Sequence, residues 1–294
     1  MPIIKVSIIY MNTLLVMKWI RINQIIALLL SCTCLTLEAK LTSIIKKAAL
    51  SGGYVLLKSS PDAIVEFANR QYQVDSKGYL AIGFNRELSG KYEISITSAS
   101  GLVEIKEIQI TAQQYNIQRV EALPSSRVIT PKKVAIINRI QAESAKVKQA
   151  RASSGDFDYW RVDEFMWPAK GRISGVYGSQ RYYNGIAASP HWGVDIAAPE
   201  GSPVYAPAGG KIVLAENDLY YSGGTIILDH GADVSSSFLH LSDINVTVGD
   251  IVKKGELIGL VGSTGRSNGP HLDWRMNIHG VRIDAKLWVK ELEL

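Results

Sequence analysis

Cysteine is almost absent from this sequence, which contains only Cys32 and Cys34. Both precede residue 40, so a chain that had lost its first 39 residues would have no thiol at all. This pattern fits an exported protein that is stabilised by its hydrophobic core rather than by disulfides.

Histidine is absent from the first 190 residues. The chain has five histidines, and all lie in roughly its last third, alongside Asp195 and Asp273: His191, His230, His240, His271 and His279. Clustered imidazole and carboxylate groups are used above all to bind zinc. The C-terminal part is therefore predicted to carry the chemistry.

Extreme composition is also absent. The apolar fraction of 47% and charged fraction of 20% describe a globular protein, and 294 residues leave room for two domains. A net charge of +5 suits a polyanionic partner such as cell wall, but it equally fits an ordinary soluble surface. Nucleic-acid binding is disfavoured because the sequence has no basic helix and no aromatic stacking motif.

The N-terminus has no apolar run of the roughly 20 residues that a membrane span needs. Lys18 and Arg21 precede a shorter apolar run at Ile25–Leu30, and the small residue Ala39 follows it. This order is typical of a secretory signal, so residues 1–39 are predicted to be one. We expect the protein to be exported to the periplasm of a Gram-negative bacterium.

Two alternatives for this segment stay open. The apolar stretch Ile3–Met17 lies upstream, and it indicates either that translation starts at Met11 or Met17 or that an uncleaved membrane anchor is present. Leu29–Cys32 loosely resembles a lipoprotein cleavage box, although Leu30 fits it poorly. Membrane association is expected only through such an uncleaved or lipidated N-terminus.

Residues 40–122 are predicted to form a small β-sandwich-like domain with a structural or targeting role. Short segments with strand character follow one another at roughly ten-residue spacing, with Ser, Pro, Asp and Gly turns between them. The predicted strands are Tyr54–Leu57, Ala63–Phe67, Tyr79–Phe84, Tyr92–Thr97 and Val103–Ile110.

Residues 123–155 are predicted to form a linker and a helix. Leu123–Pro131 has linker composition, and a helix is expected from Lys132 to about Ala152. The face expected to be buried between the domains consists of Ile136, Ile137, Ile140, Ser144 and Val147. A dimerising coiled coil is discounted because fewer than three clean heptads are present.

Residues 156–294 are predicted to form an all-β domain. Short apolar strands alternate with Gly- and Pro-rich turns, and no segment of helical period and length interrupts them. The clearest of these strands are Pro203–Pro207, Lys211–Ala215, Thr225–Asp229 and Leu257–Val261.

Three short segments of this domain present the ligand-type side chains. His271 and Asp273 are two residues apart in an expected strand, so they should face the same side. His191 and Asp195 lie in a segment where Gly193 disfavours a helix and allows the curvature that would bring both side chains to one ion. His240 is presented by a third short apolar strand.

Other polar residues of the domain are better explained without a metal. His230 is interpreted as a turn or core-edge residue, and His279 as an exposed residue in a hairpin turn. Asp229 and Asp233 are interpreted as turn residues.

The order of these motifs resembles the lysostaphin-type (LytM-like) zinc metallopeptidases, from roughly Phe165 to Trp288. The matching segments are Pro190–Val204, Gly210 before a strand, His240–Ser242, Gly249–Gly255, Gly262–Gly265 and Gly269–His271. Gly83–Arg86 and Tyr115–Arg119 are similar, with lower specificity, to the N-terminal part of proteobacterial members.

The resemblance implies a lysostaphin-type antiparallel β domain with a metal groove, preceded by the sandwich-like domain and the linker helix. It implies that His191 and Asp195 bind one Zn²⁺ ion. It also implies that His271 and His240 act beside the metal, by stabilising the developing oxyanion or handling a proton. Arg181, Tyr182 and Tyr183, in a loop beside the groove, are expected to contact substrate.

One residue departs from the family pattern. Asp273 stands where the third zinc ligand is histidine, so the expected ligand set is one histidine and two aspartates. Aspartate oxygen binds zinc at about the same distance as histidine nitrogen. The extra negative charge is expected to weaken the metal as a Lewis acid and to favour harder metals.

The resemblance therefore implies a zinc metalloendopeptidase that hydrolyses peptidoglycan stem or cross-link peptides during cell-wall remodelling. The alternative is a catalytically degenerate relative that activates another wall hydrolase or binds peptidoglycan. Asp273 favours this alternative, whereas the retained His191, Asp195, His240 and His271 favour the enzyme.

Overall fold

The computed structural model describes residues 42–120, 133–152, 154–162, 164–183 and 185–289. These residues belong to one compact unit. The predicted signal sequence and the whole predicted linker, Leu123–Pro131, lie outside them.

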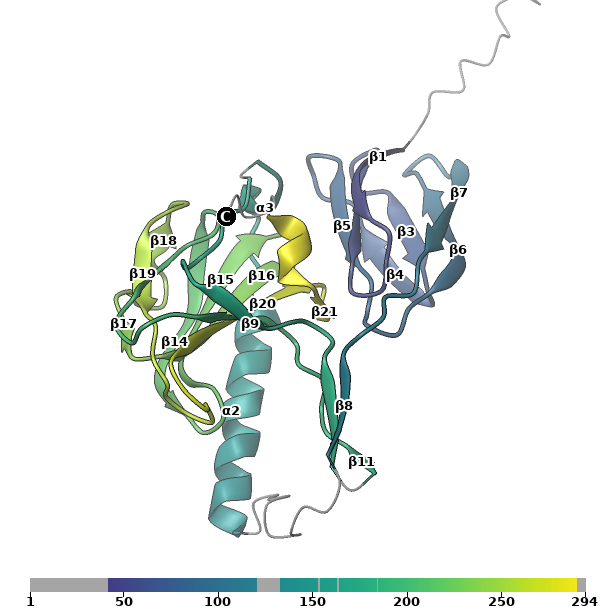
Figure 1. Cartoon of the computed structure of the whole chain (residues 1–294). Helices are drawn as coiled ribbons and strands as arrows, with labels where there is room; N and C mark the ends of the chain where they lie inside the picture. Colours follow the sequence, from purple (N-terminus) through teal and green to yellow (C-terminus); the bar gives the residue numbers. More distant parts are fainter. Residues whose placement is uncertain (1–41, 121–132, 153, 163, 184, 290–294) are drawn as a thin grey trace, which may run out of the picture. The chain divides into compact units, whose positions relative to one another are not determined.

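The N-terminal strands form two small antiparallel sheets, visible in the purple and blue part of Figure 1. The first sheet has the order β1–β2–β5, with β1 (Ser43–Ala48), β2 (Tyr54–Lys58) and β5 (Tyr79–Gly83). The second has the order β4–β3–β6–β7, with β3 (Ile64–Phe67), β4 (Arg70–Gln73), β6 (Gly90–Thr97) and β7 (Val103–Ile110).

Side chains from both sheets form one hydrophobic cluster, so the predicted small sandwich is confirmed. Ile94 and Ile96 on β6 are buried while the residues that alternate with them are more exposed, as expected for a half-buried strand. Strand β2 differs because both of its faces are buried. Val55 and Leu57 belong to the sandwich core, whereas Tyr54 and Leu56 pack into the core of the C-terminal domain.

The C-terminal domain is built on a larger antiparallel sheet, with the order β18–β14–β15–β16–β20–β12–β9 and β21 paired to β20. Its strands are β9 (Arg172–Gly175), β12 (Val194–Ala197), β14 (Gly210–Leu219), β15 (Gly223–Gly231), β16 (Val234–Leu241), β18 (Ile251–Val252), β20 (His271–Ile278) and β21 (Val281–Ile283). A smaller sheet has the order β13–β19–β17, with β13 (Pro203–Tyr205), β17 (Asp243–Ile244) and β19 (Leu257–Leu260). The predicted all-β, antiparallel fold is confirmed.

Strand β20 separates the core of this domain from a polar face. Leu272, Trp274, Met276 and Ile278 are fully buried in the hydrophobic core. Because successive side chains of a strand point to opposite faces, the odd-numbered residues from His271 onward share the other face. This polar face carries the candidate site.

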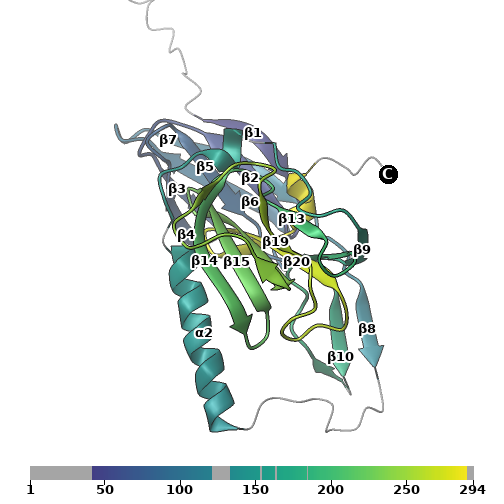
Figure 2. The same ribbon diagram turned by 90° about the vertical axis from the view of Figure 1, so that its left-hand side faces the viewer.

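The predicted helix is observed as α2 (Val134–Ala152). It packs on β14 and β15, as Figures 1 and 2 show, through Val147 and Ala150. The expectation that it lies between the domains is therefore wrong. Ile137 and Ser144 are exposed, because the face toward the sheet runs instead through Ile140, Glu143 and Val147. Shorter helical segments are α3 (Tyr159–Val162) and the 3-10 turn η2 (Ala285–Trp288).

A fifth sheet joins the two parts of the described chain. Strand β8 (Ile117–Val120) pairs in parallel with β10 (Gln180–Tyr183), which pairs with β11 (Ile186–Ala187). The sequence analysis did not predict β8. Among the described residues, no helix combines the length and the apolar character needed to cross a membrane.

Candidate metal centre

Three side chains that can bind a metal lie together on the polar face. His191 precedes β12, Asp195 lies within it, and Asp273 lies opposite Asp195 on the paired strand β20. One ligand atom from each residue lies within 4.8 Å of the others. These are the three residues that the sequence predicts as metal ligands.

Two of these donor atoms are buried and have no hydrogen-bond partner among the described residues. His191 Nε2 and Asp195 Oδ1 are shielded from solvent and lie 3.1 Å from each other. Buried polar atoms are normally paired, and an unpaired one indicates a strained, functional or ion-binding position. The arrangement of these donors fits a metal ion.

Glycine residues leave room for both carboxylates. A Cβ atom on Gly175 would overlap Asp195 Oδ2, and a Cβ atom on Gly193 would overlap Asp273 Oδ1. Neither glycine has a positive φ, so close approach rather than backbone conformation requires them. The backbone is therefore shaped around the two aspartates.

Asp273 has a partner that the sequence analysis missed. Arg275 Nε donates to Asp273 Oδ1 at 3.0 Å and to Oδ2 at 2.9 Å, and Nη2 donates to Oδ2 at 2.5 Å. Burial tends to raise the pKa of Asp273, but Arg275 outweighs it and holds that pKa below its usual range. The Asp273 carboxylate is therefore ionised at neutral pH and shared with a guanidinium group.

Arg275 also changes the charge of the candidate centre. Two carboxylates and one guanidinium carry one net negative charge, as do one carboxylate and two neutral histidines. The extra negative charge expected from Asp273 is therefore balanced locally. The sequence itself indicates Arg275 as a neighbour of Asp273, because residues two apart on a strand share a face.

His240 and His271 stand beside these donors. Their ring centroids are 4.9 Å apart, and His271 Nε2 is 3.8 Å from Asp195 Oδ1. His240 Nδ1 lies 2.8 Å from the carbonyl oxygen of Thr264, and His271 Nδ1 lies 2.8 Å from that of Gly269. A carbonyl only accepts, so both Nδ1 atoms carry the proton and both Nε2 atoms retain a lone pair in the neutral rings.

His240 is held in a costly backbone conformation. Its φ is 65°, in the left-handed region that non-glycine residues seldom adopt, and its amide donates to the carbonyl of Ser222 at 2.8 Å. Such conformations are concentrated at functional sites. Burial lowers the pKa of His240, which keeps the ring neutral and able to accept a proton at neutral pH.

The segment before His191 is tied to the N-terminal domain. His191 exchanges backbone hydrogen bonds with Gly178 and Ser179, each 2.8 Å long. Arg86 donates from Nε to the carbonyl of Gly178 at 2.9 Å and stacks on the Tyr115 ring at 4.4 Å. Arg86 and Tyr115 belong to Gly83–Arg86 and Tyr115–Arg119, the two segments that resemble the N-terminal part of proteobacterial members with lower specificity.

Burial tends to lower the pKa of His191, but Asp195 and Asp273 outweigh it, so the pKa is raised. The two carboxylates therefore favour the protonated, positively charged form of the imidazole. This is consistent with a position that attracts cations.

The three predicted substrate-contact residues lie together on β10. Arg181 donates to the Gln118 side chain at 3.0 Å, and Arg119 stacks on the Tyr182 ring at 4.7 Å. Tyr183 pairs with Ile186 on β11. These three residues thus belong to the sheet that contains β8. Their contact with substrate remains a prediction.

The residues set aside in the sequence analysis lie outside the donor group. His230 is fully buried and hydrogen-bonded to Gly209 and Ser236, which agrees with a core role. His279 is not exposed as expected, because it contacts Asp233 at 3.0 Å and the Tyr72 ring.

Asp229 is more than a turn residue. It is buried on β15, where its carboxylate accepts hydrogen bonds from Ser154 and Gly155 and so attaches the segment that follows α2 to the sheet.

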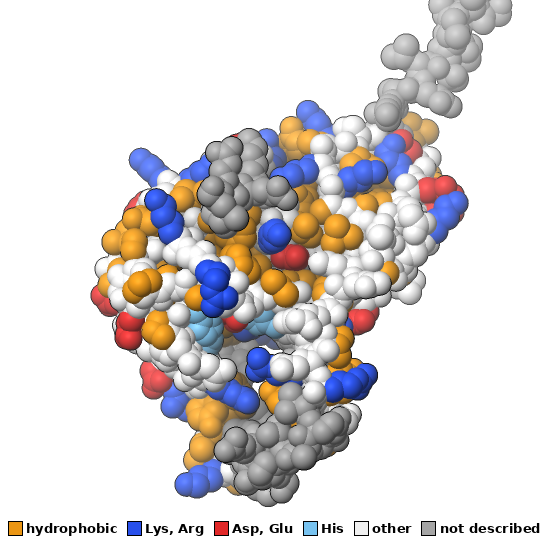
Figure 3. Space-filling view, viewed as in Figure 1, with side chains coloured by type: hydrophobic (Ala, Val, Ile, Leu, Met, Phe, Trp, Pro, Cys, Tyr) orange, Lys and Arg blue, Asp and Glu red, His pale blue; other side chains and the backbone are white. Residues whose placement is uncertain are grey.

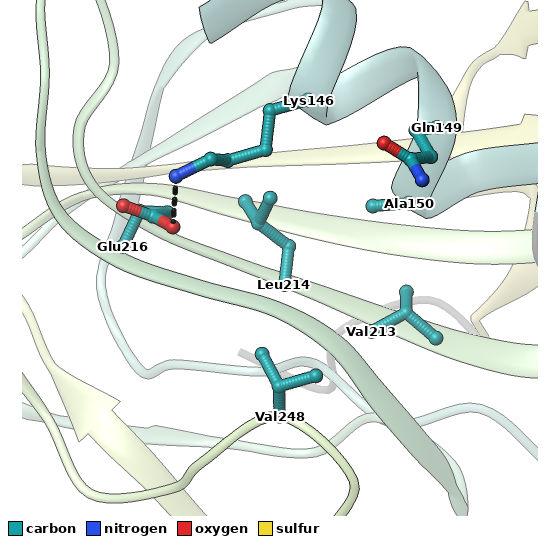
Figure 4. Close-up of a pocket in the computed structure, with 7 residues that line it drawn as sticks. All are labelled: Lys146, Gln149, Ala150, Val213, Leu214, Glu216 and Val248. Atoms are coloured by element: carbon teal, nitrogen blue, oxygen red, sulfur yellow. Dashed lines mark hydrogen bonds and ion pairs between the residues drawn. The ribbon is translucent and has the colours of Figure 1, made fainter.

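The surface of the C-terminal domain is hollowed where histidine side chains reach it, with acidic atoms between them (Figure 3). A separate cavity of about 280 Å³ lies under α2. Apolar side chains such as Leu214 and Val248 line it, and the Lys146–Glu216 ion pair crosses its edge (Figure 4). It contains none of the predicted site residues.

Comparison with known proteins identifies similarity to a peptidase family. Residues 189–285 match the sequence profile of Peptidase family M23. The peptidoglycan DD-endopeptidase ShyA of Vibrio cholerae is 37% identical over 118 residues, which is 40% of this chain and 27% of that protein. Lysostaphin of Staphylococcus simulans is 42% identical over 104 residues, covering 35% of this chain and 21% of that protein. The chain thus matches about a quarter of the length of these curated relatives.

A solved structure supports the fold over a longer range. A crystal structure from Pseudomonas aeruginosa assigned to peptidase M23 has a TM-score of 0.63 and 24% identity, and covers 82% of this chain and 95% of that one. At this identity the likeness concerns the fold alone.

Proposed function

We propose that this chain, in which residues 189–285 match Peptidase family M23, is a metalloendopeptidase that hydrolyses peptide bonds in the stem or cross-link peptides of peptidoglycan. The observation that carries the proposal is the pair of buried donor atoms without a hydrogen-bond partner among the described residues, His191 Nε2 and Asp195 Oδ1. Two histidines stand beside them, each held by a backbone carbonyl through Nδ1.

His191, Asp195 and Asp273 would hold one zinc ion. Zinc bound in such a site supplies Lewis-acid chemistry, by lowering the pKa of water and polarising a carbonyl. His191 and Asp195 can bind without giving up other contacts. Asp273 can bind through a lone pair that Arg275 leaves unused, because each carboxylate oxygen has two.

His240 and His271 would handle the proton and the developing charge of the reaction. Their Nδ1–H groups are fixed by backbone carbonyls, so each ring presents Nε2 in a defined orientation. A neutral ring can accept the proton of the attacking water and then, as imidazolium, donate it to the leaving amine. A second ring at 4.9 Å can donate a hydrogen bond to the oxyanion once it is protonated.

Peptidoglycan is the proposed substrate because several similar proteins are named peptidoglycan endopeptidases. They include ShyA and ShyB, and this chain matches only part of the length of each. Export to the periplasm, inferred from the residue pattern at 18–39, would bring the enzyme to this substrate, and N-terminal sequencing of the mature protein tests it.

A second candidate function follows from the Asp273–Arg275 ion pair. If the guanidinium excludes metal, the domain would bind wall peptides without cutting them and would serve as an activator or a binding module. Both carboxylate oxygens accept hydrogen bonds from Arg275, which is the observation in favour of this candidate.

Metal analysis of the purified chain, together with digestion of isolated sacculi, separates the two candidates. The enzyme requires about one zinc ion per chain and the release of soluble peptides, and both should disappear in a His191→Ala variant. A chain that binds sacculi, contains no metal and releases nothing would support the binding module.

A further inference from the structure

Three arginines are grouped on the polar face beside the candidate metal centre. Arg275 lies on β20, two residues from Asp273, and Arg282 on β21 pairs with Asn277 of β20. Directly paired residues of neighbouring strands point to the same side, so Arg282 shares this face. Arg151, at the end of α2, reaches Ser237, which pairs with Arg275.

These guanidinium groups have far fewer acidic partners than they need. Asp273 is bound by Arg275. Arg151 makes one side-chain hydrogen bond, of 3.3 Å to Ser237, and its buried Nε has no partner among the described residues. Arg282 Nη1 is likewise buried without a partner in the described part of the chain. Among the described residues, Asp273 is the carboxylate that an arginine of this cluster binds directly, and Asp195 acts on Arg275 from farther away.

This arrangement is electrostatically unfavourable when nothing is bound. Burial, reinforced by Arg275, lowers the pKa of Arg151 to about 10. Burial, reinforced by Arg151 and Arg275, lowers the pKa of Arg282 well below its ordinary value. A bound anion would relieve the repulsion among these guanidinium groups, because arginine keeps its proton in proteins. Arginine is suited to this role because its planar group binds a carboxylate through two parallel hydrogen bonds.

We propose that Arg151, Arg275 and Arg282 form a binding subsite for a carboxylate of the substrate peptide. The inference rests on the proposed peptidase function, since it places a free carboxylate a short distance from the bond to be cut. The carboxylate belongs either to an acidic side chain or to the C-terminus of the peptide. In both cases the subsite selects acidic peptides over neutral ones.

The test measures binding rather than cleavage, so that it stays separate from the peptidase activity. The full chain is treated with a chelator and titrated calorimetrically with an N-acetylated tetrapeptide that contains one glutamate and a free C-terminus. Two matched peptides carry an amide at the C-terminus or glutamine in place of glutamate. We expect one of these replacements to weaken binding about tenfold or more, because charge-assisted hydrogen bonds are lost, which identifies the carboxylate.

Variants then locate the subsite. Arg282→Gln and Arg151→Gln should each reduce the preference for the acidic peptide, while Arg139→Gln, on the exposed part of α2, should preserve it. Equal binding of all three peptides, or no binding of any, overturns the proposal even if no variant folds. A preference that survives both cluster variants also overturns it. Loss of sacculus digestion alone would count against the peptidase proposal and leave the subsite standing.

Discussion

The two sides of the candidate metal centre differ in how their side chains are satisfied. On one side, the His191 Nε2 and Asp195 Oδ1 atoms are shielded from solvent and have no hydrogen-bond partner among the described residues. On the other side, Asp273 is more fully buried than either residue but is bound by Arg275 through both oxygens. The first side therefore has unpaired donor atoms that a cation could satisfy, whereas on the second side the guanidinium of Arg275 already neutralises the carboxylate.

The difference bears on the proposal that Asp273 takes the place of a histidine ligand. Aspartate at position 273 brings a negative charge into a buried place, where an unpaired charge is costly. Arg275 on the same face of β20 neutralises that charge. Position 273 should therefore be judged together with position 275.

The largest effect is expected on the side without partners. Asp195→Ala removes one of the three proposed metal ligands. We expect the metal content to fall to background and the rate of sacculus digestion to drop by roughly 10³-fold or more, the scale of losing metal-dependent activation. Asp243→Ala, at an exposed aspartate, is the control and should change neither. Retention of metal by Asp195→Ala would show that Asp195 is not a ligand.

The next effect concerns Arg275 and is a loss of stability. Arg275→Met leaves the buried Asp273 carboxylate without compensation, which should reduce the free energy of unfolding of the metal-free chain by about 3 kcal/mol. Zinc should restore part of this loss, because it supplies the missing positive charge. Urea unfolding with and without zinc measures both quantities. An equal loss in the two conditions would mean that Asp273 does not contact the metal.

A smaller effect is expected beside the metal. His240→Ala should lower the rate of peptide hydrolysis by about 10²-fold, at the lower end for loss of a general acid or base. The metal content should be unchanged, since His240 is assigned no coordinating role. Metal analysis of the variant therefore separates the two roles, and loss of the ion would contradict this assignment.

The smallest effect concerns the space around Asp273. Gly193→Ala would place a methyl group against Asp273 Oδ1 and push the carboxylate away, which should weaken zinc binding by about tenfold, as for other residues that orient ligands. Gly269→Ala is a matched control, because its Cβ would meet nothing within 4 Å and its φ is not positive. Competition with a chromogenic chelator measures both affinities. Equal affinities in the two variants would show that the position of Asp273 does not matter.

Much of the fold and of the donor group could be predicted from local patterns. Period-two alternation correctly indicated β6 and β7, and the spacing of His271 and Asp273 correctly placed them on one face. These features depend only on the geometry of a strand, which the sequence carries directly.

Features that depend on distant contacts were missed. Strand β8 is short and pairs with β10, about sixty residues further along the chain, and nothing local indicates this pairing. The buried face of α2 was misassigned because Ile137 is apolar but faces away from β14 and β15. Arg275 could have been found, since it follows Asp273 at the spacing already applied to His271.

The central claim is that His191, Asp195 and Asp273 together hold one metal ion. The most direct test is a crystal structure of the full chain soaked with zinc, with anomalous data collected at the zinc absorption edge. We predict one anomalous peak at about 2.0–2.2 Å from His191 Nε2, Asp195 Oδ1 and one oxygen of Asp273. No peak among these three residues, with Arg275 still bound to both oxygens of Asp273, would contradict the claim.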